Sequence, residues 1–161
     1  MTGIEAFHIE SRVALMTPEI LSSCVALEEE CGLSSRGVEG YQKMLLSPNA
    51  ILLIAIENSE NRPVVGIFSG YVVMDELQID NLAVSDRCRR KGIGQMLLRS
   101  AVSRASRFGA RIAILEVRSA NLPARTFYEK EGFVVVGSRK RYYTAPSDDA
   151  LLFSCEIPSE S

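Results

Sequence analysis

A cluster of cationic residues stands directly before a glycine pair, where an expected strand gives way to an expected helix. Arg87, Arg89, Arg90 and Lys91 precede Gly92-Ile93-Gly94. Backbone N–H groups at a helix start have no partner within the helix and favour an anion, and glycines let the backbone approach that anion closely. Flanking cations add charge-assisted hydrogen bonds. The segment therefore predicts a phosphate-binding loop.

Two other phosphate motifs fit this segment less well. A P-loop requires Lys and then Ser or Thr after its last glycine, but Gln95 follows Gly94. A dinucleotide-binding fingerprint requires a third glycine, where Leu97 stands. Glu116 follows at a suitable distance for a ribose-binding acid, but the preceding strands look antiparallel. A cationic surface loop with a glycine turn is the simpler alternative.

Glu116 is the candidate general base. It lies in the expected strand 111–117, and alternate residues of a strand share a face, so Ile112, Ile114, Glu116 and Arg118 line one side. A carboxylate beside two isoleucines is partly desolvated, which suits a group that accepts a proton. The structural alternative is an ion pair between Glu116 and Arg118 on that face.

Tyr128 is the candidate general acid. It lies on an expected helix that begins after Asn121, a favourable N-cap, with Pro123 in the first turn where proline is tolerated. Ala124, Phe127 and Tyr128 share the inward face, so a core role is the alternative. A phenol with a pKa of about 10 can protonate a thiolate with a pKa of about 8.5.

Composition narrows the class of protein. A chain of 161 residues suits one domain, 1–161, and a net charge of −2 gives no basic field that would suggest nucleic acid. His8 is the single histidine, so we expect neither a Ser-His-Asp triad nor a two-histidine zinc site, and no metal. The cysteines form no C-x-x-C pair, and the longest apolar run, 50–56, is too short to span a membrane. The N-terminus lacks the pattern of a signal peptide, and a cytoplasmic protein is expected.

Apolar periodicity and turn residues predict the element order. The expected strands cover 7–16, 51–56, 64–74, 77–84, 111–117, 133–141 and 151–157, and the expected helices cover 18–31, 38–46, 92–108 and 122–131. Three hairpin-linked strands in the middle predict an α/β (α+β) fold with a mixed, largely antiparallel sheet and a crossover through the long helix. In the first helix we expect Cys24 and Cys31 to face the core. Glu28-Glu29-Glu30 should form a solvated face, or a surface that attracts a basic peptide.

The loop resembles a signature of a known family. Arg89-x-x-Gly92-x-Gly94 is similar to the R/Q-x-x-G-x-G/A motif of the GCN5-related N-acetyltransferases (GNAT), whose loop amides hold the pyrophosphate of acetyl-CoA. The strand 79–84 is similar to the GNAT strand that pairs with the pantetheine arm. The resemblance implies that the cofactor-binding residues are Leu82, Ala83, Val84, Arg89, Arg90, Lys91, Gly92, Ile93, Gly94, Gln95, Asn121 and Tyr128.

A longer stretch resembles one branch of that family. The residues LEVR at 115–118, Asn121 and FYEKEGF at 127–133 are similar to the RimI-like branch, which acetylates the N-terminal α-amine of a ribosomal protein. The basic and aromatic residues of 139–143 and Asp149-Ala150 also resemble this branch. The resemblance implies a GNAT fold, with a sheet of about seven strands splayed to hold acetyl-CoA, Glu116 as base and Tyr128 as acid. The amide of Leu82 or Val84 would polarise the thioester carbonyl.

The expected activity is acetyl transfer from acetyl-CoA to a protein N-terminus, by a monomer or weak homodimer. At neutral pH an α-amine with a pKa of about 8 is roughly a tenth neutral, whereas lysine with a pKa of about 10.4 is almost wholly protonated. A small-molecule amine is an alternative acceptor, because 31–35 lacks the Pro-Trp-Ser of RimI-like sequences and the chain has no Trp. A non-catalytic acetyl-CoA-binding module is the second alternative, and Glu116 and Tyr128 argue against it.

Overall fold

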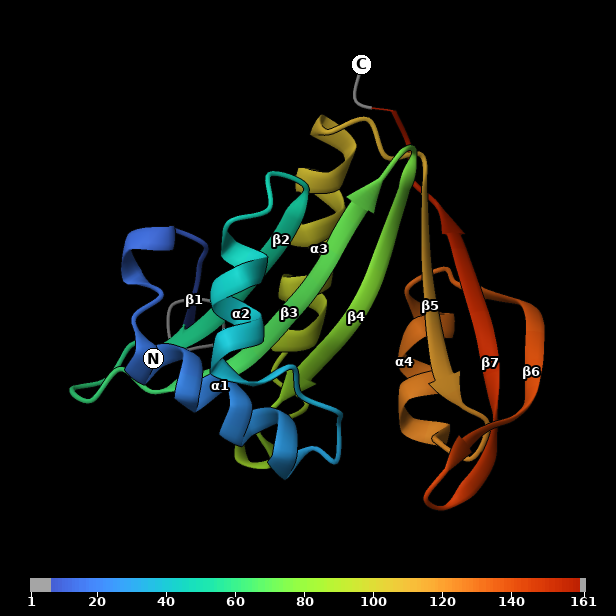
Figure 1. Ribbon diagram of the computed structural model, residues 1–161, viewed down its shortest axis with the longest axis horizontal. Helices are drawn as coiled ribbons and strands as arrows, with labels where there is room; N and C mark the ends of the chain where they lie inside the picture. Colours follow the sequence, from blue (N-terminus) through green and yellow to red (C-terminus); the bar gives the residue numbers. More distant parts are fainter. Residues whose placement is uncertain (1–6, 160–161) are drawn as a thin grey trace.

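The computed structural model describes residues 7–159, which form one sheet with helices on both faces (Figure 1). The strands are β1 (Phe7–Glu10), β2 (Ala50–Glu57), β3 (Val64–Val73), β4 (Glu76–Val84), β5 (Ile112–Arg118), β6 (Val134–Thr144) and β7 (Ser147–Glu156). The helices are α1 (Pro18–Glu30), α2 (Gly37–Leu45), α3 (Ile93–Arg107) and α4 (Leu122–Lys130), with 3-10 turns η2 (Val13–Leu15) and η3 (Asp86–Cys88). The predicted mixed sheet is confirmed.

The strand order is β1-β2-β3-β4-β5-β7-β6. Strands β4 and β5 run parallel, and each of the other neighbouring pairs is antiparallel. A parallel pair needs a crossover, and α3 supplies it between β4 and β5. This is the crossover through the long helix that the sequence predicts.

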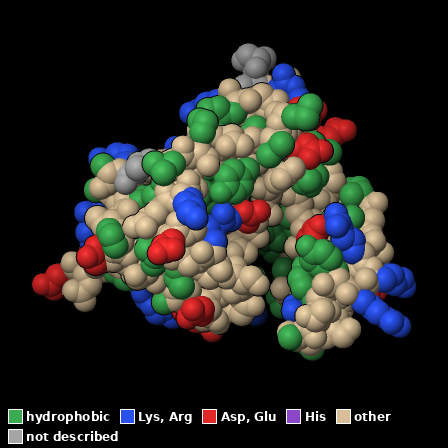
Figure 2. Space-filling view, viewed as in Figure 1, with side chains coloured by type: hydrophobic (Ala, Val, Ile, Leu, Met, Phe, Trp, Pro, Cys, Tyr) green, Lys and Arg blue, Asp and Glu red, His purple; other side chains and the backbone are tan. Residues whose placement is uncertain are grey.

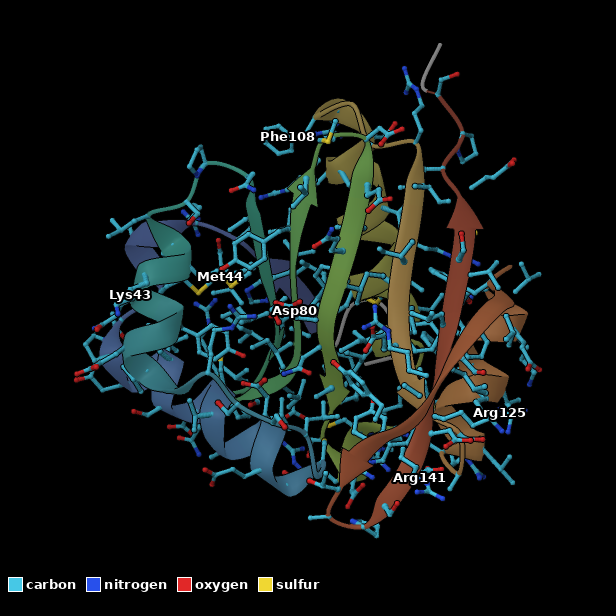
Figure 3. All side chains as sticks on the ribbon, turned by 45° about the vertical axis from the view of Figure 1, so that its right-hand side comes forward. Lys43, Met44, Asp80, Phe108, Arg125 and Arg141 are labelled. Carbon is cyan, nitrogen blue, oxygen red and sulfur yellow. The ribbon has the colours of Figure 1, made fainter. Side chains whose placement is uncertain are left out.

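Helices cover both faces of the sheet, with α1 and α2 in front and α3 behind in the view of Figure 1. Strand β2 lies between these layers, and its neighbouring residues Leu53 and Ile54 enter the α3-side and α1/α2-side clusters respectively. Both faces of β2 are buried, which explains its unbroken apolar sequence. Figure 3 shows Lys43 and Met44 on α2, of which Lys43 is exposed and Met44 is buried against the sheet.

Local signals set the helix boundaries as the sequence predicts. Thr17 caps α1, because its Oγ1 accepts a hydrogen bond from the Ile20 amide at 3.3 Å, and Pro18 is the first helical residue. Gly32, with a φ of 70°, follows the end of that helix. Within residues 7–159 no helix combines the length and the apolar character needed to cross a bilayer.

The first strand is shorter than the predicted 7–16 and ends at Glu10. The Glu10 Oε1 atom accepts hydrogen bonds from the backbone amides of Ser11 and Arg12 at 3.0 and 2.9 Å, which turns the chain away from the sheet. The Arg12 guanidinium also donates to this carboxylate, and these hydrogen bonds lower the pKa of Glu10 to about 2. The 3-10 turn η2 follows.

The last hairpin is longer than predicted, because β6 continues past Arg141 to Thr144 and β7 begins at Ser147 rather than Leu151. Polar residues build its tip: the Asp149 Oδ1 atom accepts from the Arg141 amide at 2.8 Å. Strand β7 ends at Glu156, one residue before the predicted end. These polar residues show no apolar alternation, so the sequence pattern predicts strands that stop short of the hairpin tip.

Candidate functional site

An open cleft separates β4 from β5. The two strands pair only at their first residues, Glu76–Gln78 with Ile112–Ile114, and then diverge. Beyond this point β4 pairs with β3 and β5 pairs with β7, so the edges that face each other carry no strand partner among residues 7–159. Figure 2 shows the resulting hollow between the two parts of the molecule. An extended ligand with amide groups could bind these edges as a strand would.

A β-bulge at Asp80 shapes the β4 wall of this cleft. Ile79 pairs with Gly70 and Asn81 with Ser69, so Asp80 is the extra residue. The bulge reverses which residues face α3: Leu77 and Ile79 pack there before it, and Leu82 and Val84 after it. A Cβ on Gly70 would lie 2.6 Å from the carbonyl oxygen of Gln78, so the close approach of β3 to β4 requires glycine there.

The predicted phosphate loop lies at the end of β4. Gly92 has a φ of 81° and Arg90 a φ of 62°, both left-handed. The amides of Ile93, Gly94 and Gln95 open α3 and have no acceptor within the helix. A Cβ on Gly94 would lie 3.6 Å from Phe127 and 3.7 Å from Val84, so the ends of β4, α3 and α4 converge here. The loop therefore presents amide donors beside the cleft.

Several cations of this loop contact protein groups. Arg89 forms an ion pair with Asp86 at 2.9 Å and donates from Nε to the Val84 carbonyl at 3.3 Å. Arg87 pairs with Glu57 at 3.1 Å, and the Lys91 Nζ atom lies 5.8 Å from the ring centre of Phe7. Arg90 is exposed. The cationic charge is concentrated at the loop, and Arg87 and Lys91 are directed toward β2 and β1.

Glu116 lies on the part of β5 that borders the cleft, and its side chain is 28% exposed. Its Oε1 atom lies 3.3 Å from the Nε atom of Arg139 on β6. The alternative ion pair with Arg118 is wrong, because the Arg118 guanidinium donates to the Pro146 and Ala145 carbonyls at 2.8 and 3.3 Å. The exposed guanidinium of Arg139 therefore faces the candidate base.

Tyr128 is buried on α4 among aromatic rings. Its ring centre lies 5.1 Å from Phe127, 5.4 Å from Phe133 and 6.4 Å from Phe153. Among residues 7–159 its hydroxyl makes no hydrogen bond. Burial raises the pKa of Tyr128, so the phenol stays protonated at neutral pH. The core role is present, and the phenol is in the protonated form that a proton donor needs.

Asn121 is the N-cap of α4, as predicted, and its Oδ1 atom accepts from the Ala124 amide at 3.2 Å. His8 lies on β1, where its ring contacts the Asn58 Oδ1 atom at 2.6 Å and an Arg62 nitrogen at 3.2 Å. The histidine therefore bonds to the hairpin that joins β2 to β3 and takes no part in the cleft.

Sequence reasoning missed two features near the cleft. Phe127, expected on the inward face of its helix, lies beside Gly94, a contact that no local pattern indicates. Glu28 was expected on a solvated face but is 0% exposed, whereas Glu29 and Glu30 are exposed. Its position four residues after the buried Cys24, on the same stripe of α1, could have indicated burial.

A separate hollow of about 550 Å³ lies between α3 and the end of β7, lined mainly by apolar side chains such as Leu98, Val102 and Phe133. None of the predicted cofactor-binding residues lines it. The cleft between β4 and β5 therefore remains the candidate site.

Comparison with known proteins agrees with this geometry. The sequence profile of the Acetyltransferase (GNAT) family matches residues 21–133. This chain belongs to that family. It is 34% identical over 101 residues to the [ribosomal protein bS18]-alanine N-acetyltransferase of Haemophilus influenzae, covering 61% of this chain and 68% of that protein. A Bacillus subtilis relative, given the same activity provisionally, is 38% identical over 112 residues, or 70% of this chain and 72% of its own.

Solved structures share the GNAT fold. The ribosomal-protein-S18-alanine N-acetyltransferase of Escherichia coli matches with a TM-score of 0.78 at 22% identity, over 96% of each chain. As a GNAT protein this chain is an acyltransferase. It belongs to the RimI-like branch that its sequence resembles. Its cleft fits acetyl-CoA chemically: strand edges for an amide-bearing arm, and free amides beside cations for phosphates.

Proposed function

We propose that the protein transfers the acetyl group of acetyl-CoA to the N-terminal α-amine of a protein, most simply a ribosomal protein. The names of its relatives support the acceptor. The observation that carries the proposal is the cleft between β4 and β5, with Glu116 on its β5 wall and the phosphate loop at the end of β4. We further propose that residues 1–161 act as one domain in the cytoplasm, as a monomer or weak homodimer.

The chain binds acetyl-CoA through backbone groups. The edge of β4 at Leu82, Ala83 and Val84 hydrogen-bonds the pantetheine arm, and the amides that open α3 hold the pyrophosphate with Arg89 and Arg90. Asn121 has an amide nitrogen left over after its capping bond, which is free for the coenzyme. The amide of Leu82 or Val84 polarises the thioester carbonyl. No step requires a metal ion.

Two side chains move the protons. Glu116 accepts a proton from the acceptor ammonium, directly or through one water, which frees the nitrogen lone pair to bond the acetyl carbon. Tyr128 donates its proton to the sulfur as the carbon–sulfur bond breaks. The second proton, which the nitrogen loses on becoming an amide, returns the Tyr128 phenolate to the phenol, and the proton held by Glu116 leaves to solvent. The acetyl group moves directly between the two substrates, and the products are an N-acetyl amide and the free thiol.

The acceptor is tested with acetyl-CoA, a library of N-terminal peptides and a panel of polyamines, read by mass spectrometry. Acetylation confined to the peptide α-amine is expected. Robust modification of small amines with no peptide product would instead identify a small-molecule acetyltransferase. Binding of acetyl-CoA with no turnover on any amine would indicate a non-catalytic module.

A further inference from the structure

Glu28 is a fully buried carboxylate, at 0% exposure, and within residues 7–159 no cation pairs with it. Its donors are neutral and come from different segments. Tyr41 on α2 donates to Oε1, Ser35 donates to Oε1 at 3.3 Å, and Asn81 on β4 donates to Oε2. A buried charge is costly unless it is fully hydrogen-bonded. The Glu28 carboxylate on α1 is therefore hydrogen-bonded to α2, to the loop before it and to β4.

The same contacts tie the loop between α1 and α2, residues 31–36, to β4. The Asn81 Nδ2 group also donates to the Ser34 carbonyl at 2.9 Å. The Ser35 hydroxyl accepts from the Gly37 amide at 3.1 Å while it donates to Glu28. Ser35 therefore contacts Glu28 directly, and Ser34 is connected to Glu28 through Asn81.

The attachment point on β4 is the bulge. Asp80 and Asn81 both reach toward α1 and α2: Asn81 contacts Glu28, and Asp80 forms an ion pair with Arg36. Arg36 also donates to the Tyr71 hydroxyl at 3.2 Å, and its guanidinium lies 5.5 Å from the ring centre of Tyr41. The 31–36 loop therefore holds both residues of the bulge.

We infer that Glu28 is a positioning residue of the transfer site, acting through Asn81. Leu82 follows Asn81 directly, so the contact that fixes Asn81 also fixes the direction of the Leu82 amide in the cleft. Glu28 also holds the 31–36 loop in place. In the proposed function this loop borders the side of the cleft from which the acceptor approaches. This inference rests on the proposed function, because it assigns Glu28 to the geometry of that same transfer.

Glu28→Gln tests the inference with little change of volume. Glutamine keeps one acceptor oxygen in place of two, so it cannot accept from Asn81 and from the two hydroxyls at once. We expect kcat for peptide acetylation to fall at least about tenfold and the peptide KM to rise, because small displacements of catalytic geometry are costly. The Kd for acetyl-CoA should change by a smaller factor than kcat, since the phosphate loop is untouched and the Leu82 amide is only one of the proposed coenzyme contacts. Glu29→Gln, an exposed change on the same helix, is the matched control and should leave all three values unchanged.

Hydrogen exchange gives a readout that does not depend on turnover. Amides of 31–36 and 79–84 should exchange faster in Glu28→Gln than in Glu29→Gln, while those of α3 keep their protection. Unchanged exchange and unchanged kcat would overturn the inference. A wild-type protein that acetylates no amine would refute the proposed function, and the exchange comparison would still decide the role of Glu28.

The double variant Glu28→Gln with Asn81→Asp separates positioning from general stability. It restores an amide–carboxylate pair with donor and acceptor exchanged, so part of the lost kcat and of the exchange protection should return. Recovery is partial because the carboxylate introduced on β4 cannot donate to the Ser34 carbonyl, as the Asn81 amide does. Asn81→Asp alone should be as impaired as Glu28→Gln, since two carboxylates then face each other. No recovery in the double variant would place the effect outside the contact with Asn81 and overturn the inference.

Discussion

Arg139 reaches Glu116 across an intervening strand. The two residues lie on β6 and β5, with β7 between them, and their Nε and Oε1 atoms are 3.3 Å apart. Ala150 on β7 pairs with Arg139 on one side and Arg118 on the other, and its small side chain leaves room for the guanidinium to cross. A protein cation thus stands beside the carboxylate proposed to receive the acceptor ammonium.

Arg139→Gln should therefore lower the KM for the acceptor amine. The guanidinium competes with the substrate ammonium for Glu116, and an ion pair this exposed contributes up to about 1 kcal/mol, or roughly fivefold in KM. Steady-state kinetics on the best peptide measure the effect. Lys140→Gln, the same charge change on the next residue, should alter KM little. A higher KM in Arg139→Gln alone would mean that Arg139 contacts the acceptor rather than competing with it.

Tyr128→Phe should lower kcat about a hundredfold or more without destabilising the fold. General acid catalysis contributes about 10²–10⁴-fold. The removed hydroxyl has no hydrogen-bond partner among residues 7–159, so its loss leaves no buried group unpaired. Turnover, the Kd for acetyl-CoA and the melting temperature check these points. Full turnover with intact acetyl-CoA binding would exclude Tyr128 as the acid.

Gly70→Ala should destabilise the protein by about 1–3 kcal/mol and lower activity, because the new methyl group meets the Gln78 carbonyl at 2.6 Å and displaces β4. Gly137→Ala is the control. Its nearest neighbour is the end of the flexible Leu152 side chain at 3.2 Å, so a smaller loss is expected. Urea unfolding measures both variants. Equal losses would show that the close approach of β3 to β4 is not what demands glycine.

Local signals made much of the fold predictable. Asn121 with Pro123, and Thr17 with Pro18, mark the starts of α4 and α1, because each signal depends only on residues within one helical turn. The polar stretch 58–63 marks the turn between β2 and β3 for the same reason. The glycine turn before α3 was likewise predictable, because its glycines and cations are contiguous in sequence.

Long-range contacts were not predictable from one sequence. The partner of Glu116 depends on β6 lying two strands away from β5, which no local pattern reveals. The burial of Glu28 depends on donors from α2 and β4, and the bulge at Asp80 on pairing with β3. Helical periodicity can indicate that Glu28 is buried, but it indicates neither its partners, nor the bulge, nor the partner of Glu116, and each of these features lies next to the candidate site.

Glu10→Gln should destabilise the protein at neutral pH and have no effect in strong acid. The hydrogen bonds from Arg12 lower the pKa of Glu10 to about 2, below its usual value of about 4.3. The stabilisation is therefore complete above about pH 4.3 and disappears as the pH falls toward 2. Melting temperatures from pH 7 to pH 2 test this, with Glu60→Gln, an exposed residue, as control. A difference at pH 2 as large as that at pH 7 would contradict the assignment.

Gly92→Ala should weaken acetyl-CoA binding beyond its effect on stability. Gly92 has a φ of 81°, and a Cβ there would meet nothing within 4 Å, so the cost to folding is the left-handed backbone alone, about 1 kcal/mol. Gly109, after the end of α3, has a φ of 91° and equally open surroundings. Gly109→Ala should therefore lower the melting temperature by a similar amount and leave the Kd for acetyl-CoA unchanged. Gly92→Ala should raise that Kd at least about tenfold, because relief of the strained φ redirects the amides that open α3. Equal Kd values for the two variants would remove this loop from the proposed pyrophosphate site.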